Sequence, residues 1–131
     1  MNRMKIKSEI KNITLVENLI DKIIEDFNVS SDVYGKVLLA VVEGVNNAIL
    51  HGNRGEKEKD VIIDYDVNPK TIQFNILDQG IGFDYTNLPD PTLPENLERA
   101  SGRGVFLMKH LADEFEFNES GNEVRLTFNL D

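Results

Sequence analysis

The sequence predicts an α+β domain, in which helices cover one face of a mixed but mostly antiparallel sheet. Two pairs of alternating apolar segments each flank a short turn, which is the pattern of β-hairpins. Two longer segments repeat apolar residues every three or four positions, as amphipathic helices do. Because helices and hairpins bury their apolar sides against each other, a two-layer sandwich is expected.

Each predicted element has a local signal. The first helix carries an apolar stripe and Asn12 can cap its start. The turn Asn68-Pro69-Lys70 makes the first hairpin antiparallel. In chain order we expect a strand at 4–10, helices at 13–27 and 32–50, strands at 61–67 and 71–77, a long loop at 85–101 with one helical turn at 95–100, a helix at 104–112, and strands at 115–117 and 124–130.

Length and composition limit the kind of protein. A chain of 131 residues with 40% hydrophobic residues predicts one domain, 1–131, with a single core. It has no cysteine, which excludes disulfides and thiolate metal sites and fits a cytoplasmic location. We expect no signal peptide and no membrane helix. The net charge of −9 disfavours direct binding of nucleic acid or anionic lipid.

A polar row interrupts the apolar second helix. Glu43, Asn46 and Asn47 lie three or four positions apart, so they point to one side, and His51 continues the row. One interpretation is a solvated helix face, which is the usual case. The other is a site, in which desolvation prepares Glu43 as a general base and Asn47 offers a carbonyl oxygen to Mg²⁺.

The stretch DQGIGFD, residues 78–84, follows the second hairpin strand. Asp78 shares the alternation of the apolar residues, so it should point to the core side where the strand ends. It could accept a hydrogen bond from the exocyclic amine of a planar base, and Gly80 and Gly82 would let a flat ring approach the backbone. An ordinary turn with an Asp cap is the alternative.

A second glycine cluster, SGRGVFLMKH, opens the third helix. Gly102 and Gly104 would leave backbone N–H groups free at a helix start, which suits phosphate, and Arg103 would add positive charge. An ordinary loop-to-helix junction has the same pattern.

Together these segments resemble the GHKL ATPase superfamily. The E-x-x-x-N pattern at 43–47 is similar to its N box, DQGIG at 78–82 to its G1 box, and GRG at 102–104 to its G2 box. The resemblance implies a Bergerat fold with an ATP lid at about 84–101, and ATP and Mg²⁺ as cofactors. It also implies a role for each matched residue: Glu43 as catalytic base, Asn47 as ligand of ATP-bound Mg²⁺, Asp78 as the adenine contact, Gly80 and Gly82 as shapers of the pocket, and Gly102, Arg103 and Gly104 as the phosphate segment.

The stretches EGVNNAILHGN and GRGVFLMKHLAD look most like the bacterial anti-sigma-factor serine/threonine-protein kinases. That resemblance implies binding to a sigma factor and phosphorylation of a serine on a STAS-domain anti-sigma-factor antagonist. It also makes a homodimer an option, since related proteins often dimerise.

Two other classes stay open. One is a non-catalytic ATP-binding regulator, although the presence of Glu43 favours chemistry. The other is the catalytic domain of a sensor histidine kinase, or a fragment of a gyrase or MutL-type ATPase. We expect this last class less, because His51 and His110 are the only histidines and both fall inside the domain.

Overall fold

The computed structural model describes residues 1–80 and 100–130, and for residues 100–103 the backbone alone. The elements of this part of the chain are β1 (Asn2–Lys7), the 3₁₀ turn η1 (Ile10–Asn12), α1 (Ile13–Asp26), α2 (Ser31–Asn47), the π-helical turn η2 (Ala48–Gly52), β2 (Asp60–Val67), β3 (Thr71–Leu77), α3 (Ala100–Leu111), β4 (Glu114–Phe117) and β5 (Glu123–Asn129).

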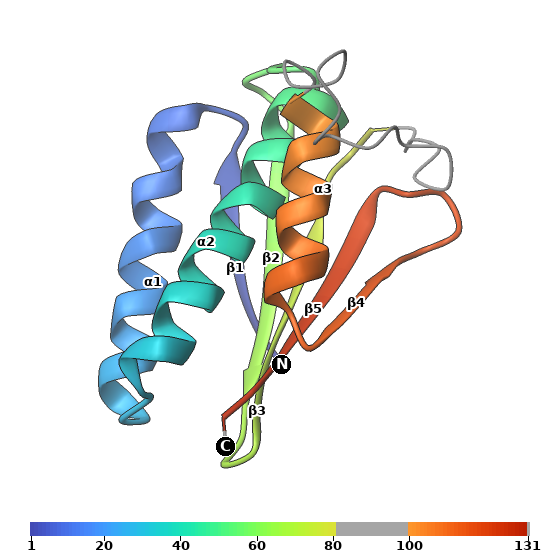
Figure 1. The fold of residues 1–131 in the computed structure, drawn as a ribbon. Helices are drawn as coiled ribbons and strands as arrows, with labels where there is room; N and C mark the ends of the chain where they lie inside the picture. Colours follow the sequence, from blue (N-terminus) through green and yellow to red (C-terminus); the bar gives the residue numbers. More distant parts are fainter. Residues whose placement is uncertain (81–99, 131) are drawn as a thin grey trace.

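The five strands form one sheet in the order β1-β2-β3-β5-β4. The three helices lie on one face of it, with α2 between α1 and α3 (Figure 1). This confirms the predicted two-layer α+β fold. All four pairings between described strands are antiparallel, so this part of the chain lacks the parallel pairing that a mixed sheet would contain.

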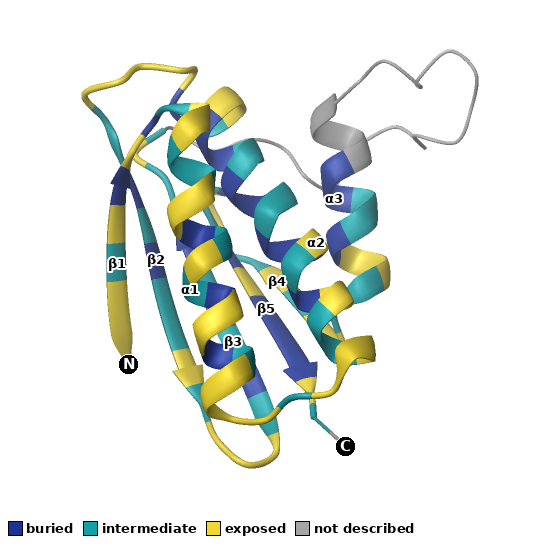
Figure 2. Ribbon diagram, turned by 90° about the vertical axis from the view of Figure 1, so that its left-hand side faces the viewer, coloured by how far each residue is buried: buried dark blue, intermediate teal, exposed yellow. Residues whose placement is uncertain are grey.

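The core lies between the helices and the sheet, where the buried sides of both layers meet (Figure 2). The alternation of β3 predicted its buried face, and Ile72, Phe74 and Ile76 are all at most 2% exposed. Burying one such side chain contributes about 1.5–3 kcal/mol. The helices and β5 supply the rest of the core, including Val16, Ile20, Val37, Val41, Val45, Met108, Leu126 and Phe128.

The central helix is longer than expected. Together α2 and η2 form a helix of 22 residues, Ser31–Gly52, which is long and apolar enough to meet the length and composition of a membrane-spanning helix. In this fold its apolar side packs on the sheet, with α1 and α3 on its flanks (Figure 1). Core packing of this kind gives a helix the same composition.

Two predictions at the N-terminus were wrong. The first strand covers Asn2–Lys7 and not 4–10, because Ser8 leaves the ladder and its hydroxyl donates to the Lys59 carbonyl at 2.8 Å. Asn12 does not cap α1 with its side chain, since η1 already gives it helical backbone angles. Its amide instead donates to the carbonyl of Lys7 at 3.0 Å.

The third helix begins earlier than predicted, at Ala100 and not at residue 104. The predicted helical turn at 95–100 falls almost wholly outside the described residues, as does most of the predicted lid. The second helix was predicted at 32–50. It begins at Ser31, where the Ser30 hydroxyl accepts from the Val33 N–H at 3.4 Å, and its last turn changes to π-helical winding.

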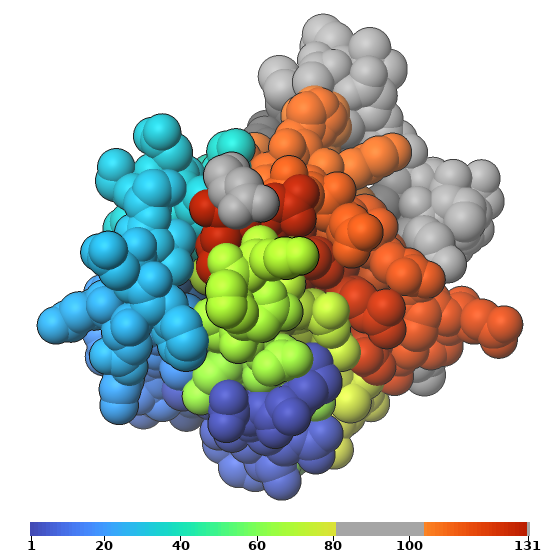
Figure 3. Space-filling view, turned by 90° about the horizontal axis from the view of Figure 1, so that it is seen from below, coloured from blue at the N-terminus to red at the C-terminus, as the bar shows by residue number. Residues whose placement is uncertain are grey.

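The two hairpin turns lie at opposite ends of the sheet. Figure 3 views the end that carries the β2–β3 turn, near the α1–α2 connection. There the side-chain oxygen of Asn68 accepts from the N–H groups of Lys70 and Thr71, at 2.8 and 2.9 Å. The β4–β5 turn lies at the other end (Figure 1).

In the β4–β5 turn, the side-chain carbonyl of the half-buried Asn118 accepts from three N–H groups, those of Gly121, Asn122 and Glu123, at 2.8, 3.1 and 3.2 Å. Asn118→Ala should therefore lower the free energy of unfolding by about 1–3 kcal/mol, because it leaves the N–H groups of Asn122 and Glu123 without their acceptor, while the Gly121 N–H keeps the backbone carbonyl of residue 118 at 3.1 Å. Urea denaturation measures the loss. The matched control is Asn68→Ala in the exposed turn, where water replaces the acceptor and the loss should be below about 1 kcal/mol. Equal losses would contradict this account.

Candidate functional site

The site begins where α2 changes to the π-helical turn η2. The N–H of Asn53 donates to the carbonyl of Ala48 at 2.8 Å, which spans five residues and not four. Short π-helical turns often occur at functional sites, because the extra residue re-aims the side chains around it. Here the turn brings the backbone of Gly52 against the end of β3.

Asp78 follows β3 and lies against this turn. A Cβ atom on Gly52 would collide with the Asp78 carboxylate, and one on Gly80 would collide with the carbonyl of Gly52. The Gly80 N–H donates to the Asp78 carboxylate at 2.8 Å, and the Asp78 N–H donates to the Asn122 carbonyl at 2.9 Å. Two glycines thus allow the carboxylate to sit against η2, on the side that its position in the strand predicted.

Burial raises the pKa of the Asp78 carboxyl above its ordinary value. The Gly80 N–H and the charge of Lys59 act in the opposite direction but are weaker. Asp78 is thus a half-buried acid whose surroundings favour the charged form less than water does.

A second cluster forms where α3 crosses α2. A Cβ atom on Gly104 would lie 3.0 Å from the Asn47 amide nitrogen and 3.2 Å from a Glu43 carboxylate oxygen. The missing side chain at this position lets α3 lie directly against the polar row of α2. Within residues 1–80 and 100–130, neither Glu43 nor Asn47 has a side-chain hydrogen bond or ion pair, so both keep their polar atoms available to a ligand.

Asn47 and Asp78 both line one cleft between α2, the sheet and the β4–β5 turn. Most of its wall is apolar, which suits a flat ring, and the polar groups are few, as is usual for ligand pockets. The cleft is lined by Gly44, Asn47, Ala48, His51, Gly52, Ile76, Asp78, Met108, Phe117, Gly121, Asn122, Glu123 and Val124.

The structure brings five of the predicted site residues into these two adjoining clusters: Glu43, Asn47, Asp78, Gly80 and Gly104. Gly82 lies outside the described residues. Gly102 and Arg103 are described by their backbone alone, in the first turn of α3, where helix N–H groups have no intrahelical acceptor.

One predicted arrangement was wrong. Gly104 is the fifth residue of α3 and does not open it, so its N–H is not among the free donors of a helix start. The role of Gly104 in the structure is steric: because it has no side chain, α3 can lie close to Glu43 and Asn47 at this position.

Most residues that line the cleft were not predicted from the sequence. Among them are Gly52, Met108 and Asn122. The fully buried Asn53 was also not predicted; it does not line the cleft but bonds to the residue after Asp78. The dipeptide at 52–53 ends the helix and resembles any helix stop, so it carried no signal of a contact with Asp78. Met108 resembles an ordinary core residue of a helix.

Asp78→Asn should make the ligand-free protein more stable at pH 7. The folded state binds the carboxyl proton more tightly than the unfolded state does, so stability falls as pH rises from the unfolded pKa, about 3.9, through the raised folded pKa. The asparagine carries no charge and still offers an oxygen to the Gly80 N–H. Thermal unfolding should show a higher melting temperature than wild type at pH 7, and the difference should shrink toward about pH 4.

The matched control is Asp66→Asn, which changes the net charge equally at an exposed position of β2. Its stability should stay within about 0.5 kcal/mol of wild type. A less stable Asp78→Asn variant at pH 7 would contradict the account of this carboxyl.

Comparison with known proteins identifies the family of this chain. Residues 6–128 match the family described as "Histidine kinase-like ATPase domain". The chain is 29% identical over 137 aligned positions to an anti-sigma F factor of Clostridium beijerinckii, covering 95% of this chain and 91% of that protein. It is 37% identical over 98 positions to an anti-sigma F factor of Bacillus thuringiensis, covering 70% of this chain and 66% of that relative.

The fold is similar to the crystal structure of the RsbU and RsbW domains of Rv1364c from Mycobacterium tuberculosis, with a TM-score of 0.61 and 13% identity. That match covers 98% of this chain and 32% of the longer one, and it shows a likeness of fold alone. The family match extends over nearly the whole chain and confirms the resemblance to the GHKL superfamily that the three motifs predicted. The chain belongs to the family of histidine kinase-like ATPase domains.

Proposed function

We propose that this domain binds ATP with Mg²⁺ in the cleft beside α2, and acts as an anti-sigma regulator with serine/threonine-protein kinase activity. The observation that carries the proposal is the convergence of Glu43, Asn47 and Asp78 on one side of the molecule through glycine contacts. The relatives named anti-sigma F factor support the regulatory part.

The fit to a nucleotide base rests on Asp78 and the apolar walls. A carboxylate accepts hydrogen bonds only, so it selects a base with an exocyclic amine. Ala48, Ile76 and Met108 supply apolar surface beside it for the flat ring. A ligand amine would add a donor to a half-buried carboxylate whose pKa is raised, and would thereby offset the cost of its burial.

The fit to Mg²⁺ rests on Asn47. Mg²⁺ prefers oxygen ligands and is commonly held by one or two protein groups together with substrate phosphates. No cluster of three His, Cys, Asp or Glu side chains suited to a metal occurs in residues 1–80 and 100–130, so a protein-only cage is not the arrangement proposed. The Asn47 carbonyl oxygen would hold the ion, and the bound ion would neutralise charge on the phosphates.

Glu43 is proposed as the general base. It lies one helical turn before Asn47, and both border Gly104. From there its carboxylate would accept the proton of a substrate serine hydroxyl as that oxygen attacks the γ-phosphorus of ATP, the bond from this phosphorus to the β,γ-bridging oxygen breaks, and ADP leaves. The free N–H groups at the start of α3, which includes Gly102, would face the phosphates.

The proposed partners are a sigma factor and a STAS-domain antagonist, whose serine would receive the phosphoryl group. The homodimer and the cytoplasmic location expected from the sequence belong to this proposal. A purely sequestering ATP-binding regulator is the competing function, and it differs in needing no base at Glu43.

The decisive experiment follows label from the γ-phosphate of ATP to a purified STAS-domain partner. Wild type should label one serine, and Glu43→Gln should lower the transfer rate by about 10²–10⁴-fold while nucleotide affinity stays similar, since a general base contributes that much. Circular dichroism of the variant confirms its folding. Good ATP binding with no label on any serine would favour the sequestering regulator.

Asn47→Ala should weaken ATP binding in Mg²⁺ by at least about tenfold, because it removes the proposed protein ligand. The ATP affinities measured by calorimetry in the presence of Mg²⁺ and in the presence of EDTA should differ for wild type and should be nearly equal for the variant. Asn46→Ala is the matched control, since Asn46 is a half-buried amide on the same helix but does not line the cleft. Unchanged affinity in Asn47→Ala would refute the ligand role.

A further inference from the structure

We propose that Asn53 and Gln79 are positioning residues for the Asp78 carboxylate, and that they thereby set the preference of the cleft for adenine over a purine base without the exocyclic amine. The inference rests on the proposed function, since it assumes that Asp78 meets the base. Neither residue lines the cleft: Asn53 is buried behind the turn that follows β3, and Gln79 is exposed.

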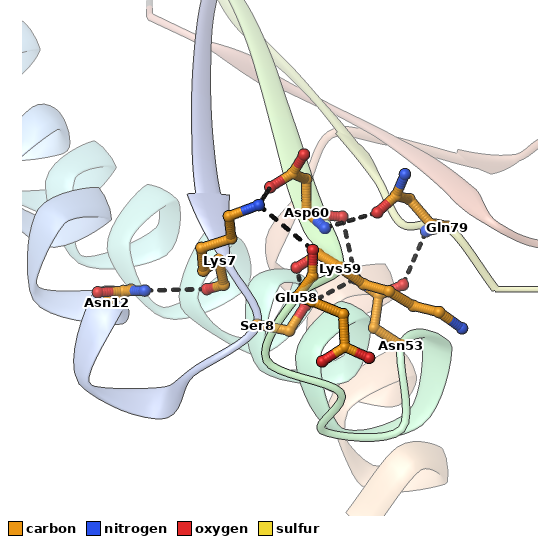
Figure 4. Close-up of polar contacts among 8 residues, drawn as sticks. All are labelled: Lys7, Ser8, Asn12, Asn53, Glu58, Lys59, Asp60 and Gln79. Carbon is orange, nitrogen blue, oxygen red and sulfur yellow. Dashed lines mark hydrogen bonds and ion pairs between the residues drawn. The ribbon is translucent and has the colours of Figure 1, made fainter.

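Asn53 has no exposed surface, and its carboxamide is fully used. Its nitrogen donates to the Ser8 hydroxyl at 2.8 Å and to the Asp60 carbonyl at 2.9 Å, and its oxygen accepts from the Gln79 N–H at 2.7 Å (Figure 4). Since a backbone N–H can only donate and a carbonyl can only accept, these partners determine the orientation of the amide. One side chain thus joins the end of β1, the start of β2 and the turn after β3.

Gln79 holds the same turn at a second point. Its side-chain carbonyl accepts from the Asp60 N–H at 2.6 Å, while its own N–H donates to Asn53 (Figure 4). Asp60 is therefore bonded to both residues: its N–H donates to the side chain of Gln79, and its carbonyl accepts from the side chain of Asn53. A residue tied at both its N–H and its side chain has little freedom to rotate.

This matters for Asp78 because the restraints surround it. The Asp78 N–H donates to Asn122, the Gln79 N–H donates to Asn53, and the Gly80 N–H donates to the Asp78 carboxylate itself. Without the hydrogen bond from the Gln79 N–H to Asn53, the turn could move the half-buried Asp78 carboxylate toward water. Such a move would be favourable for the carboxylate, because burial of a charged group costs free energy. The pair from Asn53 to Gln79 keeps the carboxylate against η2 and beside the apolar wall.

A buried amide could instead serve general stability alone, and two of the three hydrogen bonds of Asn53, those with Gln79 and with Ser8, separate these roles. One leads to Gln79 and so to Asp78. The other leads to the Ser8 hydroxyl, which is 45 residues away from Asn53 along the chain and also donates to Lys59. Loss of the first bond should alter base selection, whereas loss of the second should alter stability only.

The experiment measures the affinity for ATP and for inosine triphosphate, which has a carbonyl in place of the amine, in wild type and three variants. Wild type should bind ATP at least about tenfold more tightly. In Asn53→Ala and Gln79→Ala that ratio should fall severalfold toward one. In Ser8→Ala it should stay within about twofold of wild type, although the melting temperature falls.

Because Gln79 is exposed, Gln79→Ala should fold even if Asn53→Ala does not, and the test then stands on it. An unchanged ratio in Gln79→Ala, and in Asn53→Ala where it folds, would overturn the positioning role and leave the proposed function intact. An equal fall in Ser8→Ala would also overturn it, since any loss in the buried cluster would then suffice. Equal affinity of wild type for the two nucleotides would overturn the adenine contact itself.

Discussion

The architecture of the site depends on how closely the end of the central helix approaches β3. Gly44 of α2 packs against Ile76 of β3, and a Cβ atom added to Gly44 would lie 2.6 Å from the Cδ1 atom of Ile76. Gly52 packs against Asp78, which follows Ile76 by two residues. Gly80 then lies against the carbonyl of Gly52. A side chain at Gly80 would meet the backbone of Gly52 and push the turn away from the helix, whereas one at Gly44 or Gly52 would displace the side chain of Ile76 or Asp78. Close packing transmits such shifts because it contains few voids.

The same close packing determines what the polar groups can do. Gly104 brings α3 against Glu43 and Asn47, so a half-buried carboxylate and a half-buried amide face the backbone of a second helix. The cost falls on Asp78, because burial raises the pKa of its carboxyl and so disfavours the charged form. Proteins keep such unfavourable groups mainly where a ligand offsets their cost, which agrees with an acid that selects a base.

Much of the fold could be predicted because its signals are local. Alternation identified β3 at Thr71–Leu77, and helical periodicity identified the first two helices, each element being recognisable from its own residues. The errors fell at element ends. The first strand covers Asn2–Lys7 and not 4–10, since a 3₁₀ turn begins at Ile10. The helix α3 starts at Ala100, in a stretch whose glycines favour loops as readily as helices.

The sequence by itself determined the chemistry of the site: an acid and two amides on one helix face, an acid after a strand, and glycines where close approach is needed. Only the tertiary structure decided which of them meet. Gly52 and Asp78, or Asn53 and Ser8, are far apart in the chain, and only packing of the helices on the sheet brings them together. The physical reason is that steric fit and the hydrogen bonding of a buried amide depend on two or more segments that pack together. Periodicity and secondary-structure propensity, in contrast, belong to single segments.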